Sequence, residues 1–396
     1  MMSKTTQEVI QDGEKYVMHT YGRFPFVLDH GEGCYVWDLD GKKYLDLVAG
    51  IAVNSLGHCH PAVVKAIQDQ AAKLMHVSNL YWIENQVELA KLLVEKSGLG
   101  KAFFCNSGAE ANEAAIKLAR KWGKGEKYHI ITLKNSFHGR TMGALAATAQ
   151  EKYQKAFRPL PEGFSAVELG DLEALKAEIK PETCAVMMEP IQGESGVHVP
   201  TKEYMQSVEA LCREKGVLLI LDEVQTGIGR TGKCFAFQNF DIKPDIISLA
   251  KAMGNGFPMG AIVAKTEVAD CFKPGDHATT FGGTPIATAA GLASCGIILD
   301  EDFLIGVNYK GEYFRNGLWD LGKKHPGTVK EVRGMGLMIG CELEVSAKTV
   351  AAKLLEKGIL VNNIGDSILR FVPPLIIKKE EMDEALSALD EILASM

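Results

Sequence analysis

The sequence predicts an α/β protein with a large domain, built on a mainly parallel sheet flanked by helices, and a smaller α+β domain after it. Short apolar, β-branched runs alternate with longer stretches of helical periodicity, which is typical of a parallel sheet covered by helices. The length of 396 residues is enough for roughly two or three domains. Near residue 300 the alternation stops, which indicates a second unit.

The elements of the large domain are expected from about residue 100 onward. Each expected strand is a short apolar run, and the five runs lie at 102–105, 128–133, 185–189, 217–221 and 245–249. Helical periodicity fills the stretches between them, at 109–122, 172–178 and 202–215. Gly216 follows the last of these, where a helix C-terminus favours glycine.

The smaller domain is expected to hold a long helix, three strands and a closing helix. The long helix is expected over 307–323, and the strands over 329–333, 337–343 and 369–372. One face of the closing helix is apolar, with Met382, Ala385, Leu386, Leu389, Ile392 and Leu393. The N-terminal residues, with a hairpin-like run at 34–44, could pack with either domain, and we assign them to the smaller one. The expected division is 1–55, 56–300 and 301–396.

Composition and charge indicate small-molecule chemistry in the cytoplasm. Hydrophobic residues make up 46% and charged residues 23%, and a net charge of −7 gives no general attraction to nucleic acid or to an anionic membrane. Nine cysteines without a Cys-x-x-Cys pair indicate reduced thiols rather than a disulfide framework. Residues 1–10 are polar, unlike a secretory signal, and no apolar run is long enough to span a membrane.

Two expected strands end in residues of opposite charge. Asp222 follows the run 217–221 and Lys251 follows the run 245–249. Ligands of open α/β sheets bind at the carboxyl ends of the strands, although a structural ion pair would produce the same pattern. A desolvated lysine has a lowered pKa and supplies the neutral amine that forms a Schiff base. Pyridoxal phosphate requires such an amine and a carboxylate beside its pyridine nitrogen.

A third strand end is a candidate phosphate site. The run 101–120 passes from an expected strand through Ser107 and Gly108 into a helix, where free backbone N–H groups attract a phosphate. Gly108 lets the backbone approach an oxygen closely. Ser107 and Glu110 also form the capping-box pattern of an ordinary helix, so the pattern alone leaves both interpretations open.

Several motifs resemble those of one enzyme family. The run Leu-Asp-Glu-Val-Gln-Thr-Gly-Ile-Gly-Arg-Thr-Gly at 221–232, followed by Pro-Asp-Ile-Ile-Ser-Leu-Ala-Lys at 244–251, closely resembles the class III (ω) aminotransferases of fold type I. The resemblance covers nearly the whole chain and implies a pyridoxal 5'-phosphate-dependent transferase. The motifs most similar to those of the family members that act on N-acetylornithine lie at 56–61, 103–113, 137–141 and 369–374.

The resemblance implies a role for each residue at the cofactor. Lys251 would bond pyridoxal 5'-phosphate covalently and then move a proton at the substrate's amine-bearing carbon. Asp222 would pair with the pyridine nitrogen, and Phe137 would stack on the ring. The implied cofactor contacts are Ser107, Gly108, Ala109, Phe137, Asp222, Glu223, Val224, Gln225, Lys251 and Thr280.

Two arginines match the family's carboxylate-binding residues. The planar fork of an arginine suits a carboxylate, and the resemblance assigns this role to Arg140 and Arg370. Arg140 would receive the α-carboxylate of N-acetylornithine or the distal carboxylate of 2-oxoglutarate, and Arg370 the α-carboxylate of 2-oxoglutarate. Glu194 resembles the family's partner of the second arginine, covering it while the amine donor is bound.

Other residues imply a subunit interface and the shape of the pocket. The run 277–285 resembles a segment that crosses to the neighbouring subunit, Thr280 toward its phosphate and Thr279 toward its substrate, which implies a homodimer. Thr284 stands where the family commonly has Asn, so a hydroxyl replaces an amide. Tyr21 resembles an aromatic at the pocket mouth, and Gly50, in place of a second aromatic, leaves room for an acyl group.

These roles together imply transfer of the δ-amino group of N-acetylornithine to 2-oxoglutarate by a ping-pong mechanism, a step of arginine biosynthesis. The chain carries Lys251, Asp222, Arg140 and Arg370 together, which disfavours a binding module that has lost catalysis. The amine donors that remain as alternatives are succinylornithine, N-succinyl-diaminopimelate, ornithine and 4-aminobutyrate.

Two further interpretations find less support in the sequence. A nicotinamide-dependent oxidoreductase would fit the α/β pattern, but the glycine-rich run 334–340 misses the Gly-x-Gly-x-x-Gly spacing and leads into an expected strand. The pair His58 and His60, with a cysteine between them, has metal-ligand types at too tight a spacing, so no metal site is expected.

Overall fold

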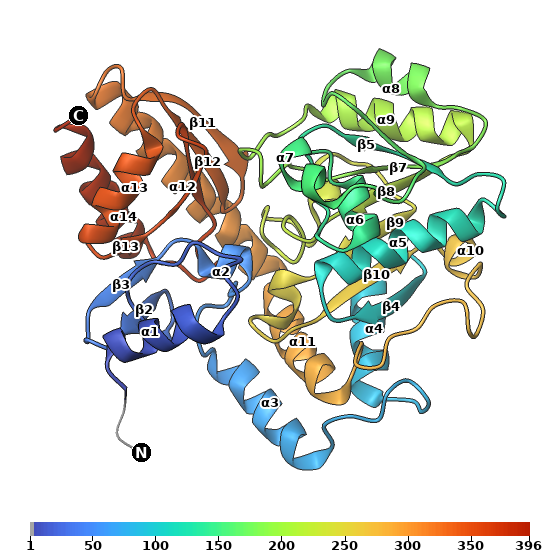
Figure 1. Cartoon of the computed structure of the whole chain (residues 1–396), viewed down its shortest axis with the longest axis horizontal. Coiled ribbons are helices and arrows are strands. Elements are labelled where there is room, and N and C mark those ends of the chain that lie inside the picture. The colour runs from blue at the N-terminus through green and yellow to red at the C-terminus, as the bar shows by residue number, and fades with distance from the viewer. Residues whose placement is uncertain (1–3) are drawn as a thin grey trace.

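A computed structural model describes residues 4–396 and contains a central seven-stranded sheet (Figure 1). The sheet order is β4-β10-β9-β8-β7-β5-β6. The strands are β4 (Lys101–Cys105), β5 (His129–Leu133), β6 (Phe164–Val167), β7 (Thr183–Met188), β8 (Leu218–Asp222), β9 (Ile246–Leu249) and β10 (Gly260–Ala264). Neighbours from β6 to β9 are parallel, whereas β10 is antiparallel to both β9 and β4. The expectation of a mainly parallel sheet is therefore confirmed.

Helices cover both faces of this sheet. On one face, α5 (Gly108–Trp122) packs its alanines and Leu118 on Ile130, Ala185 and Ile220. On the other face, α9 (Lys202–Lys215) packs Met205 and Val208 on the alternate residues of the same strands. Side chains of a strand point alternately to the two faces, so a sheet covered on both sides needs continuous apolar runs. This is why the strands were visible in the sequence.

Shorter helices and a second helical layer complete the large unit. The remaining elements of 49–299 are α3 (Pro61–Lys73), α4 (Glu84–Ser97), α6 (Met142–Ala147), α7 (Glu151–Gln154), η1 (Lys155–Phe157), α8 (Leu172–Glu178), η2 (Ala236–Asn239), η3 (Lys251–Gly254), α10 (Thr266–Ala269) and α11 (Pro285–Ile298), preceded by α2 (Ala49–Ala52). The expected bounds of α8 and α9 match the structure, and Gly216 has a φ of +59° at the end of α9.

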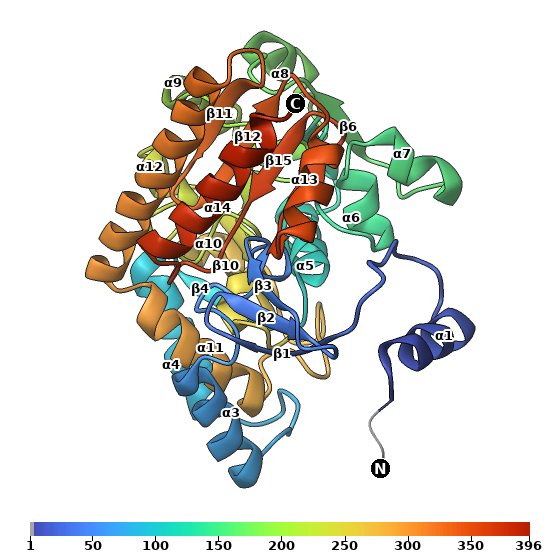
Figure 2. The same cartoon turned by 90° about the vertical axis from the view of Figure 1, so that its left-hand side faces the viewer.

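The C-terminal part is a four-stranded sheet with three helices. Its elements are α12 (Glu301–Lys324), β11 (Val329–Met335), β12 (Met338–Leu343), α13 (Ala347–Glu356), β13 (Ile359–Leu360), β14 (Asn362–Ile364), β15 (Ile368–Phe371) and α14 (Lys379–Leu393). The sheet order is β11-β12-β15-β14. Figure 2 shows α13 and α14 together over this sheet, and on α14 the expected apolar face is buried, with Leu386 only partly so.

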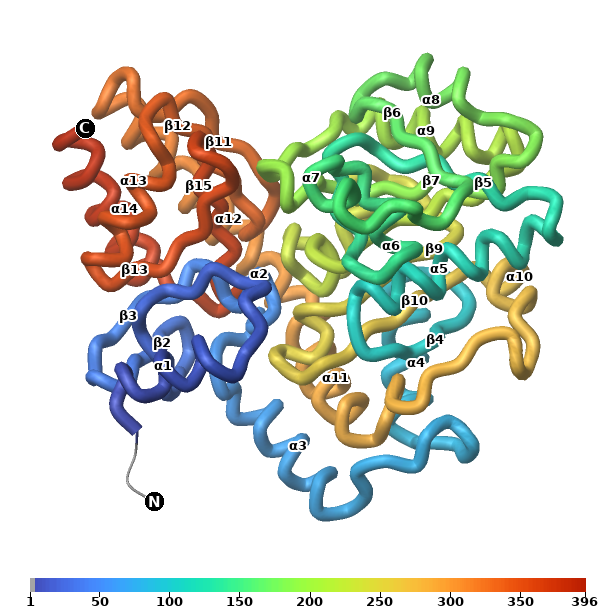
Figure 3. The backbone as a smooth tube through the Cα atoms, viewed as in Figure 1, coloured from blue at the N-terminus to red at the C-terminus, as the bar shows by residue number. Residues whose placement is uncertain are grey.

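The N-terminal segment joins the C-terminal part through a shared sheet. Its elements are α1 (Thr6–Tyr16), β1 (Leu28–Glu32), β2 (Tyr35–Asp38) and β3 (Lys43–Asp46). The expected hairpin is present, because β2 and β3 are antiparallel, and β3 pairs in parallel with β13. The backbone tube in Figure 3 accordingly shows the blue N-terminal strands beside β13, whereas Figure 2 shows α1 projecting from the body of the molecule.

One buried arginine connects the large unit to the C-terminal part. Arg230 follows β8, and its side chain is fully buried. Its guanidinium donates to the carbonyls of Leu337 (3.0 Å) and Pro373 (2.6 Å) and to the hydroxyl of Ser55 (3.1 Å). No carboxylate pairs with it in the described chain, and burial lowers the pKa of Arg230 to about 9. Across residues 4–396, no helix has the length and apolar character that crossing a bilayer requires.

Candidate active site

A cavity of about 390 Å³ lies at the C-terminal ends of β8 and β9 and at the N-terminal end of α5. Ten of the sequence-predicted site residues line this cavity: Ser107, Gly108, Ala109, Phe137, Arg140, Glu194, Asp222, Val224, Gln225 and Lys251. They come from segments spread over more than a hundred positions, and the parallel strands bring their following loops to one edge.

Lys251 stands in the short connection between two antiparallel strands. The connection from β9 to β10 covers only 250–259, which is too short for the helical crossover of a parallel pair. Lys251 itself has a φ of +47°, a left-handed conformation that non-glycine residues rarely adopt and that concentrates at functional sites. Burial lowers the pKa of Lys251, and the nearby Arg370 lowers it further, against the opposing charges of Glu194 and Asp222.

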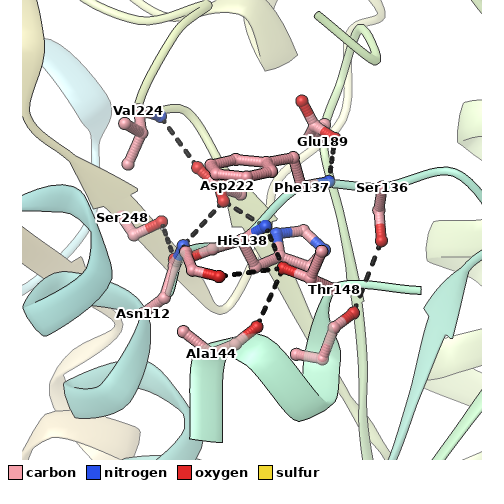
Figure 4. A network of polar contacts seen from close by, with 12 residues as sticks. Asn112, Ser136, Phe137, His138, Ala144, Thr148, Glu189, Asp222, Val224 and Ser248 are labelled. Atoms are coloured by element: carbon pink, nitrogen blue, oxygen red, sulfur yellow. Dashed lines mark hydrogen bonds and ion pairs between the residues drawn. The ribbon is translucent and has the colours of Figure 1, made fainter. Parts of the chain in front are cut away.

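The ion pair that the sequence left open between Lys251 and Asp222 is absent from the described chain. Asp222 instead belongs to a network of polar side chains shown in Figure 4. Its Oδ2 accepts from His138 Nδ1 (2.8 Å) and from Asn112 Nδ2 (2.7 Å), and its Oδ1 accepts from the N–H of Val224 (3.0 Å). These donors stabilise a charged carboxylate at the cavity wall.

A second layer fixes the donors of Asp222. Ser248 Oγ donates to Asn112 Oδ1 over 2.6 Å, which leaves the amide nitrogen of Asn112 free to face Asp222. Asn112, His138 and Ser248 were not expected at the site from the sequence. His138 lies inside the motif at 137–141, so its position was visible, but its contact with Asp222 depends on the folded chain.

The start of α5 presents free backbone donors to the cavity. Ser107 caps the helix by accepting from the N–H of Glu110 (3.2 Å). The reciprocal bond of a capping box goes elsewhere, since Glu110 accepts from the N–H of Asn106 (2.8 Å). No acceptor in residues 4–396 takes the N–H of Gly108 or Ala109, and Gly108 has no room for a Cβ, which would lie 2.7 Å from Val224 Cγ1.

These features fit pyridoxal phosphate. A phosphate would accept from the free N–H groups of Gly108 and Ala109 at the helix start. An aldehyde would bond the amine of Lys251, which has no hydrogen-bond partner in the described chain. A protonated ring nitrogen would pair with Asp222, which contacts no lysine or arginine among residues 4–396. The residues present therefore suit each end of the cofactor.

Phe137 and the loop of Glu194 are held by one buried carboxylate. Oε1 of Glu189 accepts from the N–H of Phe137 (2.9 Å), and its Oε2 accepts from the N–H of Gly193 (3.1 Å). Burial raises the pKa of Glu189 to about 7. Glu189 lines the cavity but was not expected there, because in the sequence it is only the last residue of an expected strand.

Arg370 and Glu194 form the pair that the resemblance implied. Arg370 Nη1 lies 2.6 Å from Glu194 Oε1, and its Nη2 donates to Asn362 Oδ1 over 2.6 Å. Gln225 Nε2 also donates to Glu194 (3.1 Å). Burial opposes the charge on Glu194, but Arg370 and Lys251 outweigh it and lower the pKa of Glu194. Asn362 was not among the expected residues.

Arg140 differs from Arg370 because its guanidinium has no carboxylate partner among residues 4–396. It lines the cavity with one side exposed, and its Cζ lies 3.8 Å from the centre of the Tyr153 ring and 5.4 Å from that of Phe137. Arginine stacks readily on aromatic faces. A free guanidinium at the cavity can receive a carboxylate.

The structure leaves six expected residues outside the cavity lining, one of which is Arg370, the partner of Glu194. Thr280 and Tyr21 are exposed, and Gly50 lies in α2 with a φ of +64°. Thr279 accepts from Asn106 Nδ2 over 3.1 Å, next to the cavity. The carboxylate of Glu223 is buried away from it, as described next.

The side chain of Glu223 does not line the cavity, contrary to the cofactor contact expected for it. Its carboxylate accepts from the N–H groups of Ala236 (2.9 Å) and Phe237 (2.8 Å) and from Thr226 Oγ1 (2.7 Å). It therefore holds the turn at η2 instead of facing the cavity. The hydroxyl of Thr284, which replaces the family's usual amide, has a hydrogen-bond acceptor. It donates to the carbonyl of Met75 over 2.8 Å at the start of α11.

Comparisons with known proteins agree on one family. The chain matches class III aminotransferases over residues 16–393. An acetylornithine aminotransferase of Caldanaerobacter subterraneus subsp. tengcongensis is 58% identical over 97% of this chain and 98% of its own. A crystal structure of ornithine aminotransferase from Toxoplasma gondii superposes with a TM-score of 0.95 at 33% identity, over 100% of this chain and 96% of its own. A structure of acetylornithine aminotransferase from Elizabethkingia anophelis superposes with a TM-score of 0.89 at 34% identity and covers both chains fully (100% each). With its fold, its lysine at the strand end and these matches taken together, the chain belongs to the class III aminotransferases, which use pyridoxal phosphate.

Proposed function

We propose that this chain transfers the δ-amino group of N2-acetyl-L-ornithine to 2-oxoglutarate, giving N-acetyl-L-glutamate 5-semialdehyde and L-glutamate, a step of arginine biosynthesis. The observation that carries the proposal is that one arginine lines the cavity while a second is bonded to Glu194, a residue of the cavity lining. Arg370 is paired with Glu194, whereas the guanidinium of Arg140 has no carboxylate partner within residues 4–396. The name of the 58% identical relative supports N-acetylornithine as the amine donor.

The two arginines would let one site accept substrates of different charge. N-acetylornithine has one carboxylate, which Arg140 would receive while Arg370 stays paired with Glu194. 2-Oxoglutarate has two, and its α-carboxylate would need Arg370 once Glu194 has moved away. A guanidinium binds a carboxylate with two parallel hydrogen bonds, so each contact would fix the orientation of the substrate relative to Lys251.

Lys251 would carry the proton transfer. When bound, pyridoxal phosphate supplies an electron sink for the electron pair left on the substrate carbon. Nζ of Lys251 would hold the cofactor until the donor arrives, and its lowered pKa favours the uncharged, nucleophilic amine. The same nitrogen would then take a proton from the δ-carbon of N-acetylornithine. Asp222, held by His138 and Asn112, would keep its negative charge at the far end of the site.

A homodimer with active sites at the subunit interface is part of the proposal. The chain exposes large apolar side chains, among them Leu80 (81% exposed) and Trp82 (93%). Both line a second cavity, of about 860 Å³, together with Thr279. Apolar surface concentrated in this way is typical of a protein–protein interface. Covering it with a second copy would bring Thr279 and Thr280 toward that copy, which analytical ultracentrifugation of the purified protein would test through the dimer mass.

The cytoplasmic location and the division into 1–55, 56–300 and 301–396 are also proposals. The pairing of β3 with β13 supports the assignment of the N-terminal segment to the smaller unit. Limited proteolysis would test the division, since cleavage within an exposed connection near residue 300 should release a fragment of the smaller unit before the large one is cut.

An absorption experiment tests the function directly. The purified protein is expected to be yellow, to lose its long-wavelength band with N-acetylornithine and to regain it with 2-oxoglutarate, as two separate half-reactions require. Bleaching by ornithine or 4-aminobutyrate but not by N-acetylornithine would keep the chemistry and overturn the donor. A protein that stays colourless with added pyridoxal phosphate would contradict the assignment of these residues to the cofactor.

A further inference from the structure

Tyr153 contacts two residues of the active site from outside the motifs that identify it. Its ring centre lies 3.8 Å from Cζ of Arg140 and 5.9 Å from the ring centre of Phe137, to which it is nearly perpendicular at 83°. Perpendicular aromatic pairs and stacked guanidiniums are both favourable geometries for these groups. The Tyr153 ring therefore supports the carboxylate-binding arginine and the ring-stacking phenylalanine at once.

The short helix that carries Tyr153 is anchored on both sides of the tyrosine. Gln150 Nε2 donates to the carbonyls of Asn135 (3.1 Å) and Ser136 (3.0 Å), just before Phe137. Gln154 Nε2 donates to three carbonyls at the end of α6, the shortest bond being 2.7 Å to Thr148. The backbone at 135–136 and the end of α6 therefore fix α7, so the Tyr153 ring is a stationary surface for Arg140.

Arg140 needs such a surface because little else holds it. The residue is exposed, and its guanidinium pairs with no carboxylate in the described chain. A free arginine side chain has many rotamers, and ordering it on substrate binding costs affinity. The other cation near the ring is Lys152, whose Nζ lies 4.7 Å from the Tyr153 ring centre. Arg140 approaches the same ring more closely and is the one that lines the cavity.

We propose that Tyr153 is a positioning residue that holds the Arg140 guanidinium ready for a substrate carboxylate distant from the reacting carbon. The inference rests on the function proposed above and deepens it. Tyr153 thereby sets the preference of the enzyme for a carboxylated amine donor over the same amine without a carboxylate. Removing a stacked aromatic surface from a partly exposed guanidinium is expected to lower that preference roughly three- to thirtyfold.

The experiment compares substrates that differ only in the carboxylate. The donor pair is N-acetylornithine and N-acetyl-1,4-diaminobutane, and the acceptor pair is 2-oxoglutarate and 2-oxobutanoate. Tyr153→Leu should lower the kcat/KM ratio within each pair roughly three- to thirtyfold, mainly through KM for the carboxylated member. Tyr153→Phe keeps the ring and should restore the ratio. Phe157→Leu changes an exposed aromatic in the same segment and should leave the ratio unchanged.

Two results would overturn the proposal. One is an equal loss for both members of each pair, which would indicate a structural role only; the other is a Tyr153→Phe variant as impaired as Tyr153→Leu. If Tyr153→Leu lowers the melting temperature, the same ratios are measured with Tyr153→Met, which also lacks the ring. Should the wild-type protein not use N-acetylornithine, the proposed donor is wrong, while the pair of 2-oxoglutarate and 2-oxobutanoate still tests Tyr153.

Discussion

The guanidinium of Arg370 donates over 2.6 Å to the carboxylate of Glu194, which lines the cavity. Arg370 is 1% exposed and Glu194 is partly exposed, so the contact is a partly buried, charge-assisted hydrogen bond. It joins the loop after β7 to β15, two segments far apart in the chain. Removing either partner leaves the other charge without compensation.

Replacing Glu194 by alanine is expected to favour L-glutamate over N-acetylornithine in the first half-reaction. Arg370 would then be free to receive the α-carboxylate of glutamate, which the ion pair now excludes. We expect the ratio of kcat/KM for glutamate to that for N-acetylornithine to rise about tenfold or more, equivalent to about 1.4 kcal/mol. Stopped-flow bleaching of the cofactor band gives both rates. Glu168→Ala, a change at an exposed carboxylate, is the control, and an unchanged ratio in Glu194→Ala would rule out gating by this pair.

Asp222→Asn is expected to cripple turnover while leaving the protein folded. The amide would no longer carry the charge that His138 and Asn112 stabilise, and the ring nitrogen would lose its anionic partner. We expect kcat to fall by roughly a hundredfold or more, about 2.7 kcal/mol, with a change in melting temperature of only a few degrees. Steady-state kinetics and a melting curve are the measurements. A near-normal kcat would remove Asp222 from the reaction.

Lys251→Met is expected to abolish turnover and to stabilise the cofactor-free protein. Burial lowers the pKa of Lys251, so the folded state disfavours its charge while the unfolded chain does not. As the pH falls below the pKa of Lys251 in the unfolded chain, the buried amine lowers the free energy of unfolding. Above that pKa the amine is neutral in both states, and the destabilisation vanishes. The melting temperature of the variant should therefore exceed that of the wild type at pH 7, by a margin that shrinks toward pH 10.5. A margin independent of pH would contradict this account.

Glu223→Gln is expected to flatten the dependence of stability on pH. Burial raises the pKa of Glu223 from 4.5 to about 7, so its stabilising contribution is complete below 4.5 and is lost as pH rises through about 7. At 1.36 kcal/mol per pH unit the loss amounts to about 3 kcal/mol. The variant also loses an acceptor for the N–H groups of Ala236 and Phe237, so it should be less stable than the wild type at pH 4.5 and closer to it at pH 7.5. Melting temperatures across this range, with the exposed Glu203→Gln as control, would show parallel curves if Glu223 does not titrate.

The sequence was most informative where a residue's place follows from local pattern. Asp222 and Lys251 could be predicted because each ends an apolar run, and strand ends gather at one edge of a parallel sheet. Gly108 could be predicted from a strand followed by a helix, although the structure adds a second reason, the lack of space beside Val224. The antiparallel direction of β10 was not foreseen, because it depends on the short connection before the strand and not on the strand's own residues.

The supporting residues could not be predicted because their roles depend on tertiary contacts. Asn112 lies in the middle of α5 and reads there as an ordinary helix residue, and only the fold brings it to Asp222 and Ser248. Asn362 on β14 contacts Arg370 on β15, and Tyr153 on α7 contacts Arg140, which precedes α6. Both contacts depend on how these elements pack and not on a local sequence pattern. Side-chain direction also misled the expectation for Glu223, which is next to Asp222 in a segment where successive side chains diverge.

The buried guanidinium of Arg230 has a consequence for how the molecule unfolds. Detaching either the segment of Ser55 or the C-terminal carbonyls of Leu337 and Pro373 would strip acceptors from a cation that has no counterion in the described chain. Partial opening is therefore costly, and the large unit and the C-terminal part are expected to unfold in one cooperative transition. Calorimetry of the wild-type protein should show one endotherm, and Arg230→Met should separate it into resolved steps or broaden it.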